Sequence, residues 1–299
     1  MKILLTGKNG QVGWELQRTL APLGDVVAVD RQALDLTSPD AIRALIREVK
    51  PSLIVNPAAY TAVDKAESEP EIAMAVNGNA PAIMAEEAKR LGAAMVHFST
   101  DYVFDGSKGS PYTEEDAPCP INVYGRTKLA GEQAIQAADI PHLILRTSWV
   151  YGSRGKNFLL TILRLAGERD ELKIVDDQIG APTSSRMIAE ATGQILAQCH
   201  SPIPHSPSLI TQNSGLYHLT AAGQTSWYGF TAAILENRTR LTGAPAPRLS
   251  PIPTSAYPLP APRPHYSVMS NDRLQRTFGV AMPAWQSGLN LCMEEMQTV

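Results

Sequence analysis

Short runs of consecutive apolar residues alternate with longer amphipathic segments through the first half of the chain. The runs lack the alternation of a half-exposed strand, and this is typical of strands buried on both faces of a parallel sheet. Five strands are expected, at Lys2–Thr6, Val26–Asp30, Leu53–Asn56, Met95–Ser99 and Leu143–Thr147. Helices are expected between them, at Gln11–Leu20, Pro39–Val49 and Ala80–Leu91. Repeated strand–helix–strand units predict a doubly wound parallel α/β sheet.

Residues at the expected helix ends support this division. Ser38 followed by Pro39 is typical of a helix start, because the hydroxyl caps a free N–H and the proline ring suits the first turn. Gly92 follows a basic last turn, and glycine is the usual residue just beyond a helix. Both signals place helices where the apolar pattern expects them.

The pattern becomes irregular after about residue 150. Eight of the 23 prolines lie between Pro245 and Pro264, and that density excludes a helix or a central strand there. One interpretation is a surface linker. We prefer an extended arm that closes over a ligand on the first domain, because Tyr257, Arg263 and His265 supply groups that can bind one.

Composition and charge narrow the class of protein. With 299 residues, 44% of them hydrophobic, the chain has ordinary globular composition. The 26 basic and 29 acidic residues show no basic excess, so no nucleic-acid partner is expected. Three scattered cysteines, Cys119, Cys199 and Cys292, fit neither a disulfide framework nor a metal pair. No apolar run is long enough for a membrane span, and the N-terminal run is too short for a signal peptide, so we expect a cytoplasmic protein without membrane contact.

A glycine loop follows the first expected strand and opens the first expected helix. Gly7 suits the tight turn, Gly10 allows backbone N–H groups to approach a pyrophosphate, and Gly13 allows the helix to pack against the strand. The helix N-terminus favours an anion there. Asp30 ends the second strand, 20 residues after Gly10, where it can bind ribose hydroxyls. The pattern predicts a Rossmann-type dinucleotide site, whose loop also contains Asn9, Gln11 and Val12.

The choice between NADH and NADPH stays open at this stage. Asp30 favours a ribose without a 2′-phosphate, whereas Lys8 or Arg31 could neutralise one. Asp35 and Leu36 follow the second strand and could border the adenine, although an exposed loop aspartate is an equal explanation. The end of the third strand supplies further cofactor contacts, because its small residues let a ligand pass close to the backbone; they are Ala58, Ala59 and the adjacent Tyr60.

A tyrosine and a lysine four residues apart are the strongest catalytic candidates. On a helix, Tyr124 and Lys128 share one face. A nearby ammonium favours the phenolate, so we expect Lys128 to lower the pKa of Tyr124 toward the range useful for proton transfer. Thr100 and Asp101 lie at the end of the fourth strand, and ligands of open α/β sheets bind at that end of the strands. A catalytic site of Thr100, Tyr124 and Lys128 is therefore predicted.

These motifs resemble the extended short-chain dehydrogenase/reductase superfamily and, within it, the dTDP-4-dehydrorhamnose reductase family. The resemblance runs nearly end to end, through GKNGQVGWELQ (7–17), AAYTAVDKAE (58–67), STDYVFDG (99–106), NVYGRTKLAGE (122–132), RTSWVYG (146–152), DQIGAPT (177–183) and SAYPLPAPRP (255–264).

The resemblance implies reduction of the C4 ketone of a dTDP-linked 4-keto-6-deoxy sugar by NADPH or NADH. Tyr124 would give its proton to the developing alkoxide, Lys128 would bind the nicotinamide ribose, and Thr100 would orient the carbonyl. Further substrate contacts would come from Asp101, Tyr102, Val103, Trp149 and Arg263. Trp149 could equally be a core aromatic. The product would be dTDP-L-rhamnose, a precursor of cell-surface polysaccharide.

We expect two domains. Residues 1–148 would form the dinucleotide-binding domain, with returning segments around 177–222. Residues 149–176 and 223–299 would mainly form a smaller C-terminal α/β domain that binds the sugar nucleotide.

One departure from the family concerns a metal. Some members form dimers bridged by Mg²⁺, which glutamates from three places hold. Glu15 matches the first place and Glu295 the last, but Arg186 stands at the middle one, and Mg²⁺ binds oxygen ligands. No metal is therefore predicted, a bridging Mg²⁺ is doubtful, and the protein is expected to be a monomer or a homodimer.

Two other functions fit the same motifs. A nucleotide-sugar epimerase or dehydratase shares the fold and the Tyr–Lys pair but retains its NAD. A non-catalytic regulatory subunit of the same fold is the other alternative, and the presence of Thr100, Tyr124 and Lys128 argues against it.

Overall fold

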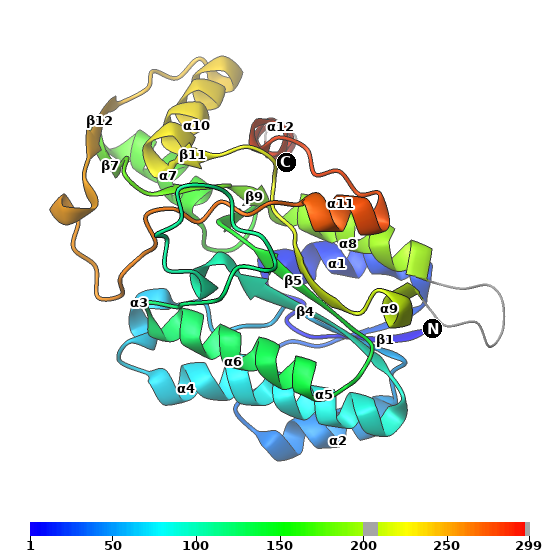
Figure 1. Ribbon diagram of the computed structural model, residues 1–299. Helices are drawn as coiled ribbons and strands as arrows, with labels where there is room; N and C mark the ends of the chain where they lie inside the picture. Colours follow the sequence, from blue (N-terminus) through cyan, green and yellow to red (C-terminus); the bar gives the residue numbers. More distant parts are fainter. Residues whose placement is uncertain (200–208, 297–299) are drawn as a thin grey trace.

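A computed structural model describes residues 1–199 and 209–296. Its centre is a parallel sheet of six strands in the order β10-β5-β4-β3-β1-β2 (Figure 1). The strands are β1 (Lys2–Leu5), β2 (Asp25–Ala28), β3 (Leu53–Asn56), β4 (Ala94–Thr100), β5 (His142–Thr147) and β10 (Gly215–His218). Because all pairs are parallel, the carboxyl ends of the strands meet at one edge, where Thr100 of β4 lies opposite Thr147 of β5.

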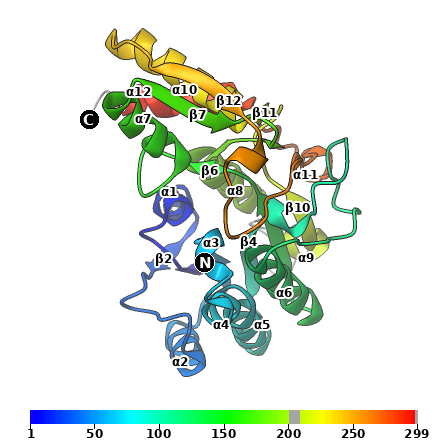
Figure 2. The same ribbon diagram turned by 90° about the vertical axis from the view of Figure 1, so that its left-hand side faces the viewer.

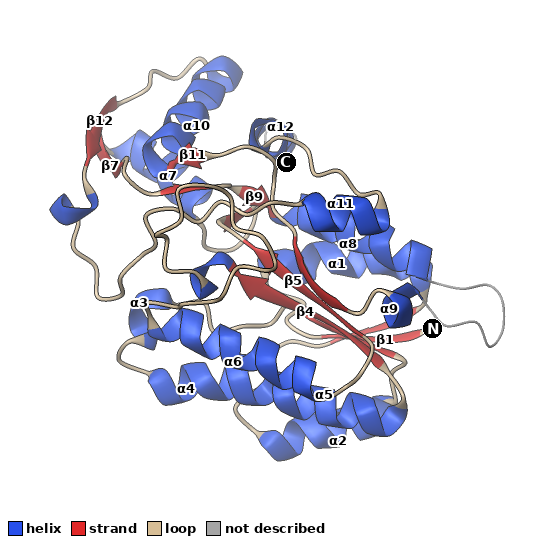
Figure 3. Ribbon diagram, viewed as in Figure 1, coloured by secondary structure: helices blue, strands red, loops and turns tan. Residues whose placement is uncertain are grey.

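Helices cover both faces of this sheet, as Figure 3 shows. One face packs against α1 (Gln11–Leu20), α8 (Ser185–Cys199) and α11 (Asp272–Phe278). The other packs against α2 (Pro39–Val49), α5 (Ala80–Leu91) and α6 (Val123–Ala137). Neighbouring residues of one strand enter different cores: Ile3 and Leu5 join the first and Leu4 the second. This two-sided burial explains why the strands are continuously apolar.

Short elements connect this layer. They are a 3₁₀ turn at Ala21–Leu23, α3 (Val63–Ala66), α4 (Pro70–Met74), a π-helical turn at Ala75–Asn79, a 3₁₀ turn at Asp101–Val103 and α9 (Leu209–Gln212). The sequence expectations about helix ends are confirmed: the Ser38 hydroxyl accepts a hydrogen bond from the N–H of Ala41, and Gly92 ends α5 with a φ of 65°.

A second, smaller core lies beyond the carboxyl ends of the strands (Figure 2). Large aromatic side chains form much of it, among them Tyr151, Phe230 and Trp285. Its helices are α7 (Phe158–Glu168), α10 (Trp227–Thr242) and α12 (Trp285–Glu295). Its strands pair two by two. The strand β6 (Val150–Tyr151) pairs with β9 (Thr183–Ser184), β7 (Glu171–Val175) with β12 (Arg248–Ile252), and β8 (Ile179–Gly180) with β11 (Thr225–Ser226).

The structure differs from the sequence expectations in three places. The second strand ends at Ala28, because Asp30 turns the chain by accepting the backbone N–H groups of Gln32 and Ala33. A sixth strand, β10, was not expected in the irregular second half. The helix α11 also returns to the first core, where Leu274 and Phe278 are buried.

The proline-rich segment is neither a long helix nor a central strand. It contributes the edge strand β12 and a 3₁₀ turn at Thr254–Ala256, and then descends toward α3 (Figure 1). This is the course of an arm that crosses from the second core to the first. Among the described residues, no helix is both long and apolar enough to cross a membrane.

Candidate functional site

The glycine loop has the geometry that a close ligand approach requires. Gly7 has a φ of +61°, a conformation that side chains disfavour. A Cβ at Gly13 would lie 2.1 Å from the Gly7 carbonyl oxygen, so the first turn of α1 packs directly on the loop backbone. Gly10 caps α1 without a side chain, which leaves the helix N-terminus accessible to an anion. The loop therefore presents its backbone and an open helix N-terminus on the same side, the features that phosphate binding uses.

Polar side chains of the loop meet at Asp30. Its carboxylate accepts a hydrogen bond from Asn9 Nδ2 at 3.2 Å and lies 3.4 Å from Lys8 Nζ. The backbone N–H of Ala33 is the largest influence that lowers the pKa of Asp30, and Lys8 lowers it further. Asp30 is thus ionised and partly neutralised by Lys8, so this corner can accept either ribose hydroxyls or, through Lys8, a phosphate.

Three further residues expected at the cofactor site, Asp35, Arg31 and Leu36, lie in the loop after β2, and Ala58 lies beside the glycine loop. Asp35 accepts hydrogen bonds from the N–H and hydroxyl of Thr37, which lower its pKa, so its carboxylate stabilises a loop. Arg31 is exposed beside Asp35, and Leu36 is half-buried. Ala58 lies directly against the Gly7 backbone.

Tyr60, Gln11 and Val12 are held by protein contacts. The Tyr60 hydroxyl donates to Glu69, which raises the tyrosine pKa. Gln11 accepts a hydrogen bond from Asn157 Nδ2 at 2.9 Å and so links α1 to the loop before α7. Val12 packs against the first core.

Thr100 and Asp101 lie together at the carboxyl end of β4. The Thr100 hydroxyl donates to Asp101 Oδ1 at 3.0 Å and accepts from the Tyr102 N–H at 3.2 Å. Asp101 is 2% exposed, and its burial raises its pKa to about 6, although hydrogen bonds from Ser267 and Thr100 oppose the rise. A carboxyl with this pKa changes charge near neutral pH.

Tyr124 faces this pair from the first turn of α6. The helix begins where the Asn122 side chain accepts the N–H of Gly125, and a Cβ at Gly125 would lie 2.1 Å from the Tyr102 carbonyl oxygen. The absent side chain thus lets α6 pack against the Asp101–Val103 turn. The rings of Tyr102 and Tyr124 meet edge to face at 5.7 Å, and the Tyr124 hydroxyl hydrogen-bonds Thr100.

Lys128 is buried one turn further along α6. Its Nζ donates to the Phe98 carbonyl at 2.6 Å and lies 3.2 Å from His97 Nε2. Burial lowers the pKa of Lys128 to about 8, and the charge of Glu132 opposes this. The lysine is therefore fixed against β4.

The expected lowering of the Tyr124 pKa by Lys128 is wrong for this arrangement. Burial is the largest influence and raises the pKa of Tyr124 to about 12, with Thr100 lowering it and Asp101 raising it further. The physical reason is that the Lys128 amino group is turned to the backbone of β4 and to His97.

The expected substrate residues are all buried or half-buried. Trp149 follows β5 with a φ of +46°, a strained conformation for a side-chain-bearing residue. Its ring stacks on Trp227 at 3.5 Å and lies over Gly180, where a Cβ would be 2.4 Å from the indole. Val103 packs its side chain in an apolar cluster with Phe104.

Arg263 reaches the site from the arm. Its guanidinium is paired with both carboxylate oxygens of Asp64 in α3, at 2.5 and 2.8 Å, and it hydrogen-bonds the Tyr102 hydroxyl. Asn122, the cap of α6, also donates to the Pro262 carbonyl at 2.9 Å. The arm is thus fastened beside Tyr124. The other two arm residues differ: Tyr257 is 56% exposed, and His265 lies beside the Asp177 carbonyl.

Glu15, Arg186 and Glu295 come together although they are far apart in the sequence. Arg186 lies 3.4 Å from the Glu15 carboxylate and 2.7 Å from that of Glu295. A guanidinium between the two acids repels a cation. Within the described part of the chain, no group of three or more histidine, cysteine or acidic side chains could hold a metal ion.

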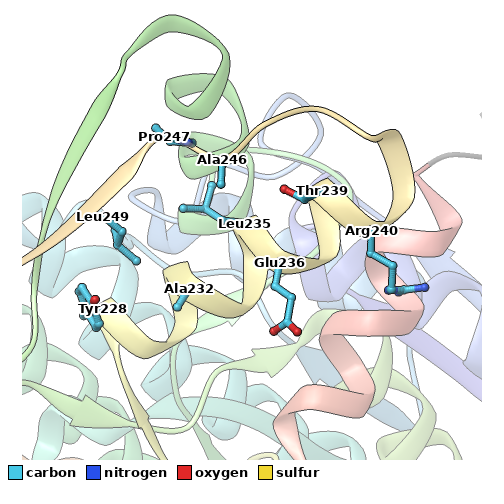
Figure 4. A pocket seen from close by; sticks show the side chains of 9 residues that line it. All are labelled: Tyr228, Ala232, Leu235, Glu236, Thr239, Arg240, Ala246, Pro247 and Leu249. Atoms are coloured by element: carbon cyan, nitrogen blue, oxygen red, sulfur yellow. The ribbon is translucent and has the colours of Figure 1, made fainter.

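An open surface groove of about 610 Å³ lies away from this chemistry, between α10 and β12 (Figure 4). Apolar side chains such as Leu235 and Leu249 line much of it, and Glu236 and Arg240 stand at its edge. None of the residues expected at the catalytic or cofactor site lines it.

Sequence reasoning missed several polar residues behind the site. Asn56 and His97 are buried polar residues within apolar strands, and that interruption was the available signal. Asn77 joins the Tyr60 backbone to the Thr127 hydroxyl from the π-helical turn. Asp64 and Trp227 carried no signal because their partners are distant in the sequence. Asn122 indicates only a helix start, since its second partner, the Pro262 carbonyl, is equally distant.

Comparison with known proteins gives a consistent picture. The dTDP-4-dehydrorhamnose reductase of Burkholderia thailandensis is 51% identical over 99% of both chains. A crystal structure of a dTDP-4-dehydrorhamnose reductase from Clostridium acetobutylicum superposes with a TM-score of 0.89 and 39% identity, covering 99% of this chain and 100% of that one. The same enzyme from Bacillus anthracis, in complex with NADP, has a TM-score of 0.88 and 34% identity, covering 98% and 99%. The family described as RmlD substrate binding domain matches residues 1–298, and the chain belongs to it.

Proposed function

We propose that this protein reduces the C4 ketone of dTDP-4-dehydro-β-L-rhamnose to dTDP-L-rhamnose with NADPH or NADH. The observation that carries the proposal is the meeting of the glycine loop, Thr100 and Tyr124 at the carboxyl edge of one parallel sheet. Ligands of such sheets bind at this edge. The relatives named above are reductases of this substrate class, and the likeness covers the whole chain.

The residues present fit a nicotinamide dinucleotide. The loop of Gly7, Gly10 and Gly13 would hold the pyrophosphate, since a side chain at Gly13 would collide with the loop backbone. Asp30 and Lys8 would hold the adenosine ribose or its 2′-phosphate. When bound, the cofactor supplies the hydride for the sugar carbon. The protein supplies the binding site and the proton.

Tyr124 is suited to give that proton. A phenol with a pKa of about 12 keeps its proton at neutral pH and can pass it to the more basic oxygen that develops at C4. Thr100 lies beside the Tyr124 hydroxyl. Its O–H donates to Asp101 Oδ1 in the structure and would turn to donate a second hydrogen bond to the C4 oxygen, which stabilises the charge there. Lys128 would bind the nicotinamide ribose from the same helix face.

We also propose that each of the two cores binds a different ligand. The first core, residues 1–148 with the returning segments, would bind the dinucleotide. The second core and the arm would bind the sugar nucleotide, with Trp149 against an apolar face of the sugar and Arg263 near its phosphates. Asp101 and Tyr102 would contact the sugar from the end of β4.

The direct test is the oxidation of NADH and NADPH, followed by the loss of absorbance of the reduced nicotinamide, with dTDP- and UDP-linked 4-keto-6-deoxy sugars. We expect turnover with the dTDP-linked ketone and conversion of the ketone to an alcohol. Inertness toward every such ketone would overturn the proposal. Protein purified with tightly bound NAD and without net cofactor consumption would instead indicate an epimerase or dehydratase.

A further inference from the structure

Behind Lys128, a chain of buried side chains crosses the sheet. Lys128 Nζ lies 3.2 Å from His97 Nε2, and His97 Nδ1 lies 3.1 Å from Asn56 Nδ2. Asn56 Oδ1 accepts the hydroxyl hydrogen of Thr6 at 2.6 Å. The side chains are at most 1% exposed. Thr6 immediately precedes Gly7, so the chain joins the lysine of α6 to the start of the glycine loop.

The hydrogens in this chain can be placed in only one way for the orientation observed. An amide nitrogen donates and does not accept, so His97 Nδ1 must accept from Asn56. Burial is the largest influence on the pKa of His97 and holds it well below its ordinary value, so the ring is neutral and carries one proton. That proton is on Nε2 and points at Lys128 Nζ. Only an uncharged amine has the lone pair to accept it.

A charged Lys128 requires the opposite direction. An ammonium group must donate to His97 Nε2, which places the ring proton on Nδ1. Nδ1–H then needs an acceptor, and a 180° turn of the Asn56 amide supplies Oδ1 while Nδ2 donates to the Thr6 oxygen. In both arrangements Lys128 also donates to the Phe98 carbonyl. Each charge state of the lysine thus has a hydrogen-bonded arrangement that pairs both ring nitrogens.

We propose that His97 and Asn56 are positioning residues that hold Lys128 in one place in both of its charge states, with the tautomer of His97 changing as the lysine gains or loses a proton. Loss of one proton from the ammonium to water leaves an amine. The ring proton of His97 moves from Nδ1 to Nε2 by exchange, without a change in ring charge, and the Asn56 amide turns.

Few charged groups act on this pair. On α6, Glu132 favours the ammonium, and it is itself held by Arg146 of β5 at 2.6 Å. Tyr124, one turn before Lys128, is influenced by Asp101. The neighbours on the other side are uncharged: Asn56 of β3 and Thr6, the residue after β1. The charge of Lys128 is therefore set by burial, Glu132 and the chain itself.

This inference rests on the proposed function, because a proton exchange at Lys128 matters only if Lys128 belongs to the reductase site. The Lys128 amino group is buried against β4. If His97 could not change between accepting and donating a hydrogen bond, one charge state of the lysine would leave a buried polar group unpaired, which costs free energy in a protein interior. The chain removes that cost. Lys128 can then exchange a proton during turnover without leaving its position.

The test is made on the wild-type protein and needs no substrate. The protein is labelled with ¹⁵N in histidine and ¹³C at the lysine ε carbon, and both signals are followed by NMR from low to high pH. We expect Lys128 to titrate near pH 8, and His97 to carry its proton on Nδ1 below that midpoint and on Nε2 above it. His97→Gln and Lys128→Arg identify the two signals.

Two variants act in opposite directions. In Asn56→Asp a carboxylate accepts from Nδ1–H in every state, so the tautomer no longer changes and the Lys128 midpoint rises by about one pH unit or more. In His97→Leu the ammonium loses an acceptor, and the midpoint falls by about as much. Ser99→Ala is the control, because this buried hydroxyl of β4 has no hydrogen-bond partner in the described structure and should leave both signals unchanged.

Titration of Lys128 while His97 keeps one tautomer would overturn the proposal, as would midpoints that the two variants leave unchanged. If a variant does not fold, the wild-type tautomer measurement decides alone. These readouts are independent of turnover, so an absence of reductase activity would defeat the proposed function and leave this inference to be judged by the spectra.

Discussion

The Tyr124→Phe variant separates proton donation from binding and folding. Only the phenolic oxygen is removed. Its hydrogen-bond partner, the Thr100 hydroxyl, still donates to Asp101 at 3.0 Å and accepts from the Tyr102 N–H at 3.2 Å. No buried group is left unpaired, so the loss in unfolding free energy should be about 1 kcal/mol, as for one ordinary hydrogen bond. The ring contact with Tyr102 is retained.

The effect on catalysis should be much larger. A positioned proton donor contributes about 10²- to 10⁴-fold to the rate, which corresponds to about 3 to 5 kcal/mol of transition-state stabilisation. We therefore expect kcat to fall by that factor, while the dissociation constant of the cofactor changes by about twofold or less because the hydride donor is held by other residues.

Three measurements check this reasoning: steady-state oxidation of NADPH with the dTDP-linked ketone, fluorescence titration of the cofactor, and thermal unfolding. Tyr217→Phe is the matched control, since this buried tyrosine of β10 also loses one hydrogen bond, to the Asn213 carbonyl, and should keep its kcat. A Tyr124→Phe enzyme with nearly wild-type kcat would refute the role of the phenol. An equal loss in the control would show that the effect is one of folding.

Three further predictions follow from distances and burial. Gly13→Ala should abolish cofactor binding, because its Cβ would lie 2.1 Å from a loop carbonyl oxygen, whereas Gly167→Ala in α7 meets open space and should raise the melting temperature. Burial raises the pKa of Asp101 to about 6, above its unfolded value near 4. The contribution of this carboxyl to the free energy of unfolding is therefore fully present below pH 4 and is lost as the pH rises through 6. Asp101→Asn should therefore melt progressively higher than wild type between pH 4 and 6, by an amount that corresponds to about 3 kcal/mol, and a constant difference would contradict this. Asp64→Asn weakens the pairing with Arg263 and should raise the KM for the sugar nucleotide about three- to tenfold with little change in kcat; a fall in kcat alone would argue against an anchoring role.

The first half of the fold could be read from the sequence because its signals are local. Continuous apolar runs such as Leu53–Asn56 became central strands, and the cap at Ser38 and the stop at Gly92 lie at helix ends. These features depend on the residues themselves and their immediate neighbours. The second half could not be predicted in the same way, because its strands are two to five residues long and its strand pairs, such as β7 with β12, join distant segments.

The candidate site shows the same division. The glycine loop and the pair Tyr124 and Lys128 could be named from spacing, because both patterns lie within one turn or one helix. The charge relations could not. Lys128 was expected to act on Tyr124, but its amino group lies against His97 and the Phe98 carbonyl, and burial dominates the pKa of the tyrosine.

The sequence by itself therefore determined the first five strands of the central sheet and three helices of its first layer, α1, α2 and α5. It also singled out the glycine loop, since each of these features follows from periodicity, capping or the lack of a side chain. Only the tertiary structure decided which polar groups meet. Arg186 between Glu15 and Glu295, Arg263 on Asp64, and His97 behind Lys128 are contacts between segments 31 to 199 residues apart. Their energies depend on distance and on exclusion of water, and neither quantity is written in the order of the residues.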